Sequence, residues 1–218
     1  MGLRMLPLLL PGLMWVASSA TAGSVEVTVN ERGGKPAEDA VVYLVPTADA
    51  PTTRAAVTAA VMDQQNKEFI PHVLPIFTGM AVNFPNWDNI KHHVYSFSPP
   101  KKFELPLYTG TPASPVIFDK PGIVVLGCNI HDWMVGYIYV LPTPYFAKTG
   151  SDGKARLTEV PAGAYEVKVW HPRIRGSSEP LSRPIAVGAT GTDPGGFVLS
   201  LKREWKLPRR YENTQGGG

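Results

Sequence analysis

The chain has 218 residues, of which 44% are hydrophobic and 18% are charged. This apolar content is too high for a disordered chain and is enough for one or two compact domains. The net charge of +3, from 21 basic and 18 acidic residues, gives no electrostatic argument for nucleic acid or an anionic membrane as the principal partner. The 21 Gly and 22 Pro residues indicate many turns between short strands.

The first residues have the pattern of a secretory signal peptide. Arg4 precedes an apolar stretch from Met5 to Val16, and the small residues Ala20-Thr21-Ala22 end the segment. The stretch is too short and too interrupted by Pro and Gly to span a bilayer comfortably, although an uncleaved anchor is the alternative. We therefore expect residues 1–22 to be a signal peptide, the mature protein to be periplasmic in a Gram-negative bacterium, and no membrane span to remain after cleavage.

The segment after the leader reads as part of a β-sandwich. Valines at every second position from 24 to 29 indicate a half-buried strand, and a turn is expected over 30–36. A second, more buried strand is predicted over 40–45. The Ala-rich stretch 55–61 fits either a helical turn or a strand. Residues 23–56 are predicted to be the first part of an outer β-domain.

The middle segment, residues 57–142, differs in character from its flanks. It is richer in aromatic residues, and it holds four of the five histidines and the only Cys. Short strands separated by turns, without helical periodicity, indicate a small β-sandwich or barrel. The predicted strands are 73–76, 81–84, 93–97, 116–118, 123–126 and 135–140.

After residue 142 the sequence again has the character of the segment that precedes the middle domain. Residues 147–149 and 154–158 are predicted to form a hairpin closed at Asp152-Gly153, and strands are predicted over 165–170 and 197–201. The two flanks would each leave a hydrophobic sheet face uncovered, so we expect 23–56 and 143–201 to form one sandwich interrupted by the middle domain. Residues 202–218 are predicted to be a flexible tail.

The sole cysteine indicates a metal site. An exported protein with one Cys cannot form an internal disulfide, and a free thiol is a liability in an oxidising compartment unless a metal occupies it. In the sequence Gly127 to Met134, a buried strand ends at Cys128, and a tight loop presents His131 and then Met134. Thiolate, imidazole and a distant thioether, with a second imidazole, are the ligands of a blue-copper site.

Either His92 or His93, at the start of a predicted neighbouring strand, can supply the second imidazole. Only one of the two can face the metal, because successive side chains of a strand point to opposite faces. Other metal groups fit less well: a structural zinc site or an iron–sulfur cluster needs more sulfur, and haem attachment needs a C-x-x-C-H motif. A protease-type cysteine gives no reason for the methionine.

These residues resemble a known family. The middle segment is similar to the cupredoxins, and the C-x2-H-x2-M loop resembles that of amicyanin-type blue copper proteins, as does the preceding stretch PIFTGMAVNFPNWDNIKHHVYSF. The resemblance implies a Greek-key β-sandwich, with His92 as the first ligand and His93 where the family usually has Asn. This departure keeps His93 open as the alternative.

The flanks have a resemblance of their own. GKPAEDAVVYLVP and SDGKARLTEVPAGAYEVKVWHP resemble carboxypeptidase-regulatory-like (transthyretin-like) sandwiches. The whole chain is similar to exported bacterial proteins labelled methylamine utilisation proteins, a label that says little about activity.

The cupredoxin resemblance implies periplasmic one-electron transfer through a single type 1 copper ion, with no catalytic residues and no enzyme activity. The implied partners are redox proteins of the cytochrome or dehydrogenase type, which the exposed ring edge of His131 would meet. The alternatives are a copper carrier, a copper enzyme and a metal-free structural sandwich. A carrier would be expected to have Met- or His-rich clusters, and an enzyme would need further histidines for a second copper.

Several other residues are expected to have ordinary roles. His72 is expected to be solvated and His171 to be structural. Trp87, Trp133 and Phe103 could shield the metal or belong to the core, and around such a site these roles coincide. Asp132 and the pair Lys101-Lys102 are expected to be solvated surface groups.

Overall fold

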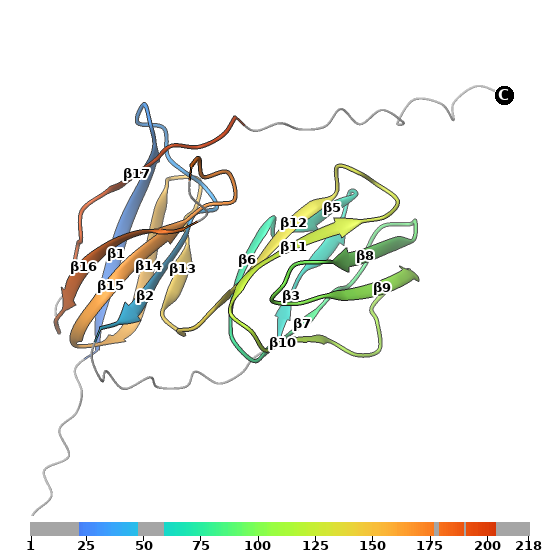
Figure 1. The fold of residues 1–218 in the computed structure, drawn as a ribbon, viewed down its shortest axis with the longest axis horizontal. Helices are drawn as coiled ribbons and strands as arrows, with labels where there is room; N and C mark the ends of the chain where they lie inside the picture. The colour runs from blue at the N-terminus through green and yellow to red at the C-terminus, as the bar shows by residue number, and fades with distance from the viewer. Residues whose placement is uncertain (1–21, 48–58, 177–178, 190, 204–218) are drawn as a thin grey trace, which may run out of the picture.

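The computed structural model describes residues 22–47, 59–176, 179–189 and 191–203. These residues form 17 β-strands and no helix, arranged as two β-sandwiches (Figure 1). The predicted all-β fold class, a Greek-key sandwich beside a second sandwich, is confirmed. Because this part of the chain has no helix, it also contains none that is long and apolar enough to cross a membrane. Residues 1–21 of the predicted signal peptide (1–22) and residues 204–218 of the predicted tail (202–218) lie outside the described residues.

The outer sandwich is built from both ends of the described chain. Its apolar core contains alternate residues of the first strand, Val25, Val27 and Val29, each fully buried as period-2 patterning requires. The three-stranded sheet has the order β14 (Lys154–Pro161), β1 (Ala22–Glu31), β17 (Phe197–Leu199). The four-stranded sheet has the order β13 (Phe146–Lys148), β2 (Val41–Pro46), β15 (Gly163–Trp170), β16 (Leu181–Val187).

The predicted hairpin between residues 147 and 158 is wrong. Strand β13 pairs with β2, whereas β14 pairs with β1, so the two strands belong to opposite sheets of the sandwich. The turn itself exists: Gly153 has φ 72°, and a Cβ there would lie 2.5 Å from the carbonyl oxygen of Val29. The Asp-Gly turn therefore carries the chain from one sheet of the sandwich across to the other.

The inner sandwich lies between the two halves of the outer one in sequence. Its larger sheet has the order β6 (Val73–Phe77), β12 (Val135–Leu141), β11 (Gly122–Cys128), β8 (His92–Ser96), β9 (Phe103–Tyr108). Strand β6 runs parallel to β12, and the other pairs are antiparallel. The smaller sheet has the order β10 (Val116–Phe118), β7 (Met80–Asn83), β3 (Ala60–Val61), and β4 (Asp63–Gln65) pairs with β5 (Glu68–Ile70).

The undecided stretch 55–61 ends in a strand, β3, and its residues 55–58 lie outside the described part. Four strands, β4, β5, β9 and β16, were not predicted. Three of them are polar or interrupted by Pro: β4 is Asp-Gln-Gln, and β9 and β16 each contain a proline. Pairing with a neighbour, rather than a hydrophobic pattern of their own, defines these strands.

A third buried cluster joins the two sandwiches. On β12, Ile138 and Val140 face the core of the inner sandwich, while Tyr139 and Leu141 alternate onto the opposite face of the sheet. There they pack with Trp170 and Tyr43 of the outer sandwich, and the hydroxyls of Tyr43 and Tyr139 lie 3.0 Å apart. The rings of Tyr139 and Trp170 meet edge to face with centroids 5.0 Å apart. This cluster holds the two sandwiches together.

Candidate metal centre

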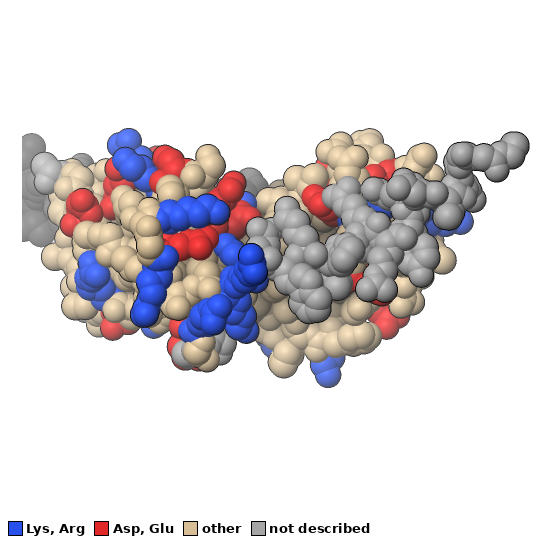
Figure 2. Space-filling model, turned by 90° about the horizontal axis from the view of Figure 1, so that it is seen from above, with Lys and Arg blue, Asp and Glu red and all other residues tan. Residues whose placement is uncertain are grey.

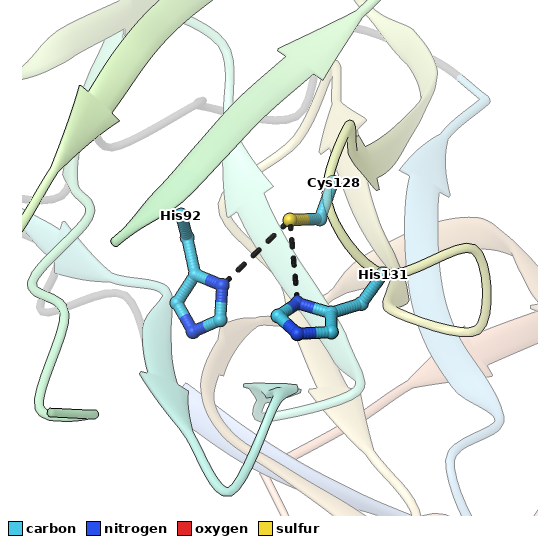
Figure 3. Close-up of side chains that lie close together, drawn as sticks. All are labelled: His92, Cys128 and His131. Carbon is cyan, nitrogen blue, oxygen red and sulfur yellow. Dashed lines mark hydrogen bonds between the residues drawn. The ribbon is translucent and has the colours of Figure 1, made fainter. Parts of the chain in front are cut away.

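Two neighbouring strands and one loop bring three potential ligands together (Figure 3). Cys128 is the last residue of β11, and it pairs with Val94 of β8. His92 lies two residues before Val94 and therefore on the same inward face. His131 comes from the loop between β11 and β12. His92 and Cys128 are buried, and His131 is partly exposed.

The distances between the donor atoms fit a common metal ion. Cys128 Sγ lies 3.7 Å from His92 Nδ1 and 3.9 Å from His131 Nδ1. All three donor atoms lie within 4.8 Å of one another. Ligand bonds of about 2.0–2.3 Å at trigonal angles of about 120° place sulfur and nitrogen roughly 3.8 Å apart. The cluster is therefore preshaped to hold a metal ion among one thiolate and two imidazoles.

The structure separates His92 from His93. The side chain of His92 is fully buried beside Cys128. His93 points to the other face of β8, where its Nε2 lies 3.7 Å from Glu104 Oε2 and its side chain is 21% exposed. Its Nε2 has no hydrogen-bond partner within the described residues. Of the two histidines, only His92 lies in the cluster.

Asp88 orients the ring of His92. The Asp88 Oδ2 atom lies 2.7 Å from His92 Nε2, and because a carboxylate only accepts, the hydrogen bond assigns a proton to Nε2, which donates its N–H to Asp88. The Nδ1 atom is then the unprotonated nitrogen, and it faces Cys128 Sγ. A carboxylate behind a histidine ligand fixes its tautomer and raises its basicity, as in many metal sites. Asp88 was not predicted as a partner of His92, although the sequence shows an acidic residue four positions before this histidine.

The same carboxylate is held by the turn between β4 and β5. Asp88 accepts the backbone N–H groups of Asn66 at 2.7 Å and of Lys67 at 2.8 Å. Asn66 and Lys67 both have positive φ, the conformation of a type I′ hairpin turn. Burial opposes the charged carboxylate, but hydrogen bonds from His92, Lys67 and Asn66 lower the pKa of Asp88 overall. The carboxylate therefore stays ionised against His92.

Asn86 organises the loop that leads into β8. This buried side chain donates from Nδ2 to the carbonyls of Ile90 and Tyr108, each at 2.9 Å. Its Oδ1 accepts the backbone N–H of Asp88 at 3.0 Å. Asn86 thus fixes the position from which Asp88 reaches His92. No local pattern in the sequence singles out this residue.

A second polar group lies beneath the loop. Tyr108 donates its hydroxyl to the carbonyl of Phe84 at 2.7 Å, and Gln64 Nε2 approaches that hydroxyl at 2.5 Å. Burial raises the pKa of Tyr108 to about 12, so the phenol stays protonated at neutral pH. The side chain of Gln64 is fully buried. These contacts join β4 and β9 to the segment that follows β7, beside the cluster.

His131 is available as a neutral ligand. Burial, followed by the neighbouring His92 and Lys67, lowers the pKa of His131. Its ring lies 5.1 Å from the ring of His92 and 5.2 Å from that of Trp133, measured between centroids. The imidazole is therefore held between two rings and keeps an unprotonated nitrogen at neutral pH.

Met134 lies in the same core as Cys128. It is 1% exposed, and its backbone N–H donates to the carbonyl of His131 at 3.0 Å, which closes the loop between β11 and β12. The loop therefore delivers the thioether into the interior and leaves the neighbouring Asp132 exposed.

The other singled-out residues divide between core and surface. Phe103 packs against the inner core beside Phe84 and Phe118, whereas Trp87 is 67% exposed and does not belong to that core. His72 is exposed and packs edge-on against Tyr137. Two further residues are held by contacts remote from the cluster: Lys101 lies 3.8 Å from Asp119, and His171 is buried in the outer sandwich.

Comparisons with known proteins give structural likenesses only. No family model and no curated protein matches the chain. A purple cupredoxin from Nitrosopumilus maritimus is 22% identical, with 38% of this chain and 98% of that chain covered and a TM-score of 0.33. A mutant of amicyanin in its reduced state is 20% identical, with 45% of this chain and 99% of that chain covered and a TM-score of 0.35.

A copper-containing nitrite reductase from Thermus scotoductus SA-01 is 26% identical, with 44% of this chain and 25% of that chain covered and a TM-score of 0.36. All of these TM-scores lie below 0.5, so the interpretation of the centre rests on its own donor atoms and their geometry.

Proposed function

We propose that the chain is a one-electron carrier with one blue (type 1) copper ion, held by His92, Cys128 and His131 with Met134 as the weak axial ligand. The observation that carries this proposal is the single buried cysteine sulfur, Cys128 Sγ, between two imidazole Nδ1 atoms at 3.7 Å and 3.9 Å. One thiolate and two imidazoles in a trigonal arrangement, with a thioether nearby, are the donor set of electron-transfer copper sites.

Copper bound here would accept and release one electron as it changes between Cu(II) and Cu(I). The chain's own part is to keep its ligands still during that change. Cys128 is fixed in β11, and His92 is tied through Asp88 to the turn at Asn66 and Lys67. A prearranged ligand set lowers the reorganisation that accompanies electron transfer.

His131 is the proposed point of electron exchange. It is the one member of the cluster that is not buried, and the adjacent Ile130 is 50% exposed. A small apolar surface around an exposed ligand edge suits brief encounters with periplasmic redox proteins of the cytochrome or dehydrogenase type.

The test is to load the purified protein with Cu(II) and record its visible absorption and electron paramagnetic resonance. The wild-type protein is expected to be intensely coloured through thiolate-to-copper charge transfer, and Cys128→Ala is expected to abolish the colour. His92→Ala should lose the signal, while its neighbour His93→Ala serves as the matched control and should keep it. A colourless protein that binds only Cu(I) would support a carrier instead, and a protein that binds no copper would support a structural role.

A further inference from the structure

The metal cluster depends on how β8 and β11 lie beside each other, because His92 comes from one strand and Cys128 from the other (Figure 1). Strand β11 pairs with β12 as far as Gly127, which lies opposite Val135. Cys128 is one residue further on and pairs with Val94 of β8. In the part of the chain that the structure describes, β8 is therefore the strand that holds Cys128 from the side.

The junction between β8 and β11 is short. Besides the pair at Cys128, Gly127 lies opposite Tyr95. One residue beyond the strand, the N–H of Asn129 donates to the carbonyl of His93 at 3.1 Å. So short a stretch of backbone pairing leaves much of the work of fixing the sulfur to the side chains that pack over the junction.

The side chain of Tyr95 packs over this junction on the outer face of the sheet. Successive residues of a strand point to opposite faces, so Gly127 faces outward where Cys128 turns its sulfur inward. A Cβ at Gly127 would lie 2.7 Å from Cζ of Tyr95 and 2.8 Å from its hydroxyl oxygen. The end of the ring therefore occupies the place of a side chain at residue 127. An aromatic ring laid across a glycine of the neighbouring strand stabilises the pairing of the two strands.

Two further rings hold the ring of Tyr95 in that place. His93 and Phe97, two residues before and after it, share its face of the sheet. The ring of His93 meets that of Tyr95 edge to face with centroids 6.3 Å apart, and the centroid of Phe97 lies 5.1 Å away. Tyr95, Phe97 and Gly127 line one open depression of this face. Because the depression is open, the ring of Tyr95 is what covers Gly127 on this side.

The contact between Tyr95 and Gly127 is apolar packing rather than a charge interaction. Phe97 and Val125 beside the ring are uncharged residue types. The Lys and Arg side chains visible in Figure 2 stand mainly over the outer sandwich. Salt screens charges but not apolar packing. The contribution of Tyr95 should therefore be the same at low and high ionic strength.

We propose that Tyr95 is a positioning residue of the metal centre: its ring, packed on Gly127 from the outer face, holds the end of β11 against β8 and so keeps Cys128 Sγ at its distance from His92 Nδ1. Tyr95 lies on the opposite face of the sheet from the cluster, so it acts through the backbone of Gly127 and Cys128. Its expected effect on copper rests on the proposed function, whereas its effect on the sulfur does not.

The first measurement uses the purified full chain without metal. Because Cys128 is the only cysteine, the rate at which a chromogenic aromatic disulfide modifies it at a fixed pH reports how firmly the sulfur is held. Tyr95→Ala is expected to raise this rate about tenfold or more, since a looser strand end opens more often. Tyr95→Phe keeps the ring and should react like the wild-type protein.

The second measurement loads the same proteins with Cu(II). Tyr95→Ala should weaken or broaden the thiolate-to-copper absorption and raise the dissociation constant of copper about tenfold, while Tyr95→Phe should keep both as in the wild type. Gly127→Ala should act like Tyr95→Ala, because the added methyl group and the ring compete for one space. The double variant should therefore be no worse than either single change.

Tyr137→Ala is the matched control. Tyr137 is also a partly buried tyrosine of the same sheet, but its ring packs against His72 and Trp170, away from the cluster. It should lower the stability of the protein without a comparable change in the reactivity of Cys128 or in the copper absorption.

Three results would each overturn the role of Tyr95: unchanged reactivity and absorption in Tyr95→Ala, equal changes in Tyr137→Ala or Tyr95→Phe, and additive effects of Tyr95→Ala and Gly127→Ala. A wild-type protein that binds no copper would overturn the proposed function instead. In that case the reactivity of Cys128 in the metal-free variants still decides whether Tyr95 positions the sulfur.

Discussion

The Asp88 carboxylate joins the hairpin turn between β4 and β5 to His92 of the cluster, although this turn and His92 are far apart in the sequence. It accepts the N–H of Asn66, 22 residues away, and holds His92 Nε2 at 2.7 Å. A carboxylate in this place sets both the direction of the ring and its basicity.

Asp88→Asn is expected to weaken copper binding about tenfold to a hundredfold, because the amide keeps the shape but loses the charge behind His92. Competition with a chelator of known affinity measures the change. Asp119→Asn is the control, since Asp119 is 63% exposed and its partner, Lys101, is a surface residue. Equal affinities of the two variants would show that Asp88 has no special role at the centre.

His171 should make the free energy of unfolding depend on pH. Its Nε2 lies 2.9 Å from the carbonyl of Glu38, and its Nδ1 accepts the N–H of Arg173 at 3.0 Å, so both nitrogens are used by the neutral ring. Burial, with a smaller contribution from Arg173, lowers the pKa of His171 to about 4.

Because the unfolded chain has a histidine pKa near 6.5, His171 gives its full stability above that pH. The stability is lost as the pH falls from about 6.5 through about 4, by roughly 3 kcal/mol in total. Urea unfolding at pH 7.5 and pH 4.5 measures the effect. His171→Gln, which keeps a donor for Glu38, should show a shallower pH dependence; equal slopes would contradict the prediction.

At the scale of elements, the approach of β5 to β12 requires a glycine. A Cβ at Gly136 would lie 2.8 Å from the Cβ of Phe69, an atom too close to the backbone to move cheaply. The hairpin of β4 and β5 therefore sits tightly against β12, and its turn carries the N–H groups that hold Asp88. Packing of one glycine against one phenylalanine thus helps to position the centre.

Gly136→Ala is expected to destabilise the protein by about 1–3 kcal/mol, because β5 must shift away from β12. Denaturant unfolding measures the loss, and the copper absorption should broaden or weaken as the turn moves. Gly188→Ala is the matched control, since nothing lies within 4 Å of a Cβ at that position. Similar stabilities of the two variants would show that β5 adapts without cost.

At the scale of the whole molecule, the cluster around Trp170 couples the two sandwiches. Trp170 is 3% exposed and contacts Tyr139 and Tyr137 of the inner sandwich through their rings. Because both sandwiches contribute to this buried cluster, unfolding of one sandwich removes contacts that stabilise the other.

Trp170→Ala is expected to cost about 3–5 kcal/mol and to split a single calorimetric unfolding transition into two. Trp87→Ala makes the same chemical change at a side chain that is 67% exposed, and it should leave the transition unchanged. A single transition in Trp170→Ala, with little change in midpoint, would mean that the cluster does not couple the sandwiches.

Local patterns were enough to predict many of the strands. The alternating valines of β1 were recognised because burial alternates with a period of two along a strand with one buried face. The continuous apolar run of β2 and the strand before Cys128 were recognised as short buried strands. The spacing of Cys128, His131 and Met134 is equally local, since all three belong to one loop and its borders.

Long-range pairing decided the rest. His92 and His93 have apolar neighbours on both faces of β8, so the choice between them depends on which face of the sheet is turned toward the core. The expected hairpin failed for the same reason, because the partners of β13 and β14 are strands from the N-terminal part of the chain. Asp88 and the turn at Asn66 meet only in the folded chain, since a hydrogen bond across 22 residues leaves no local signal.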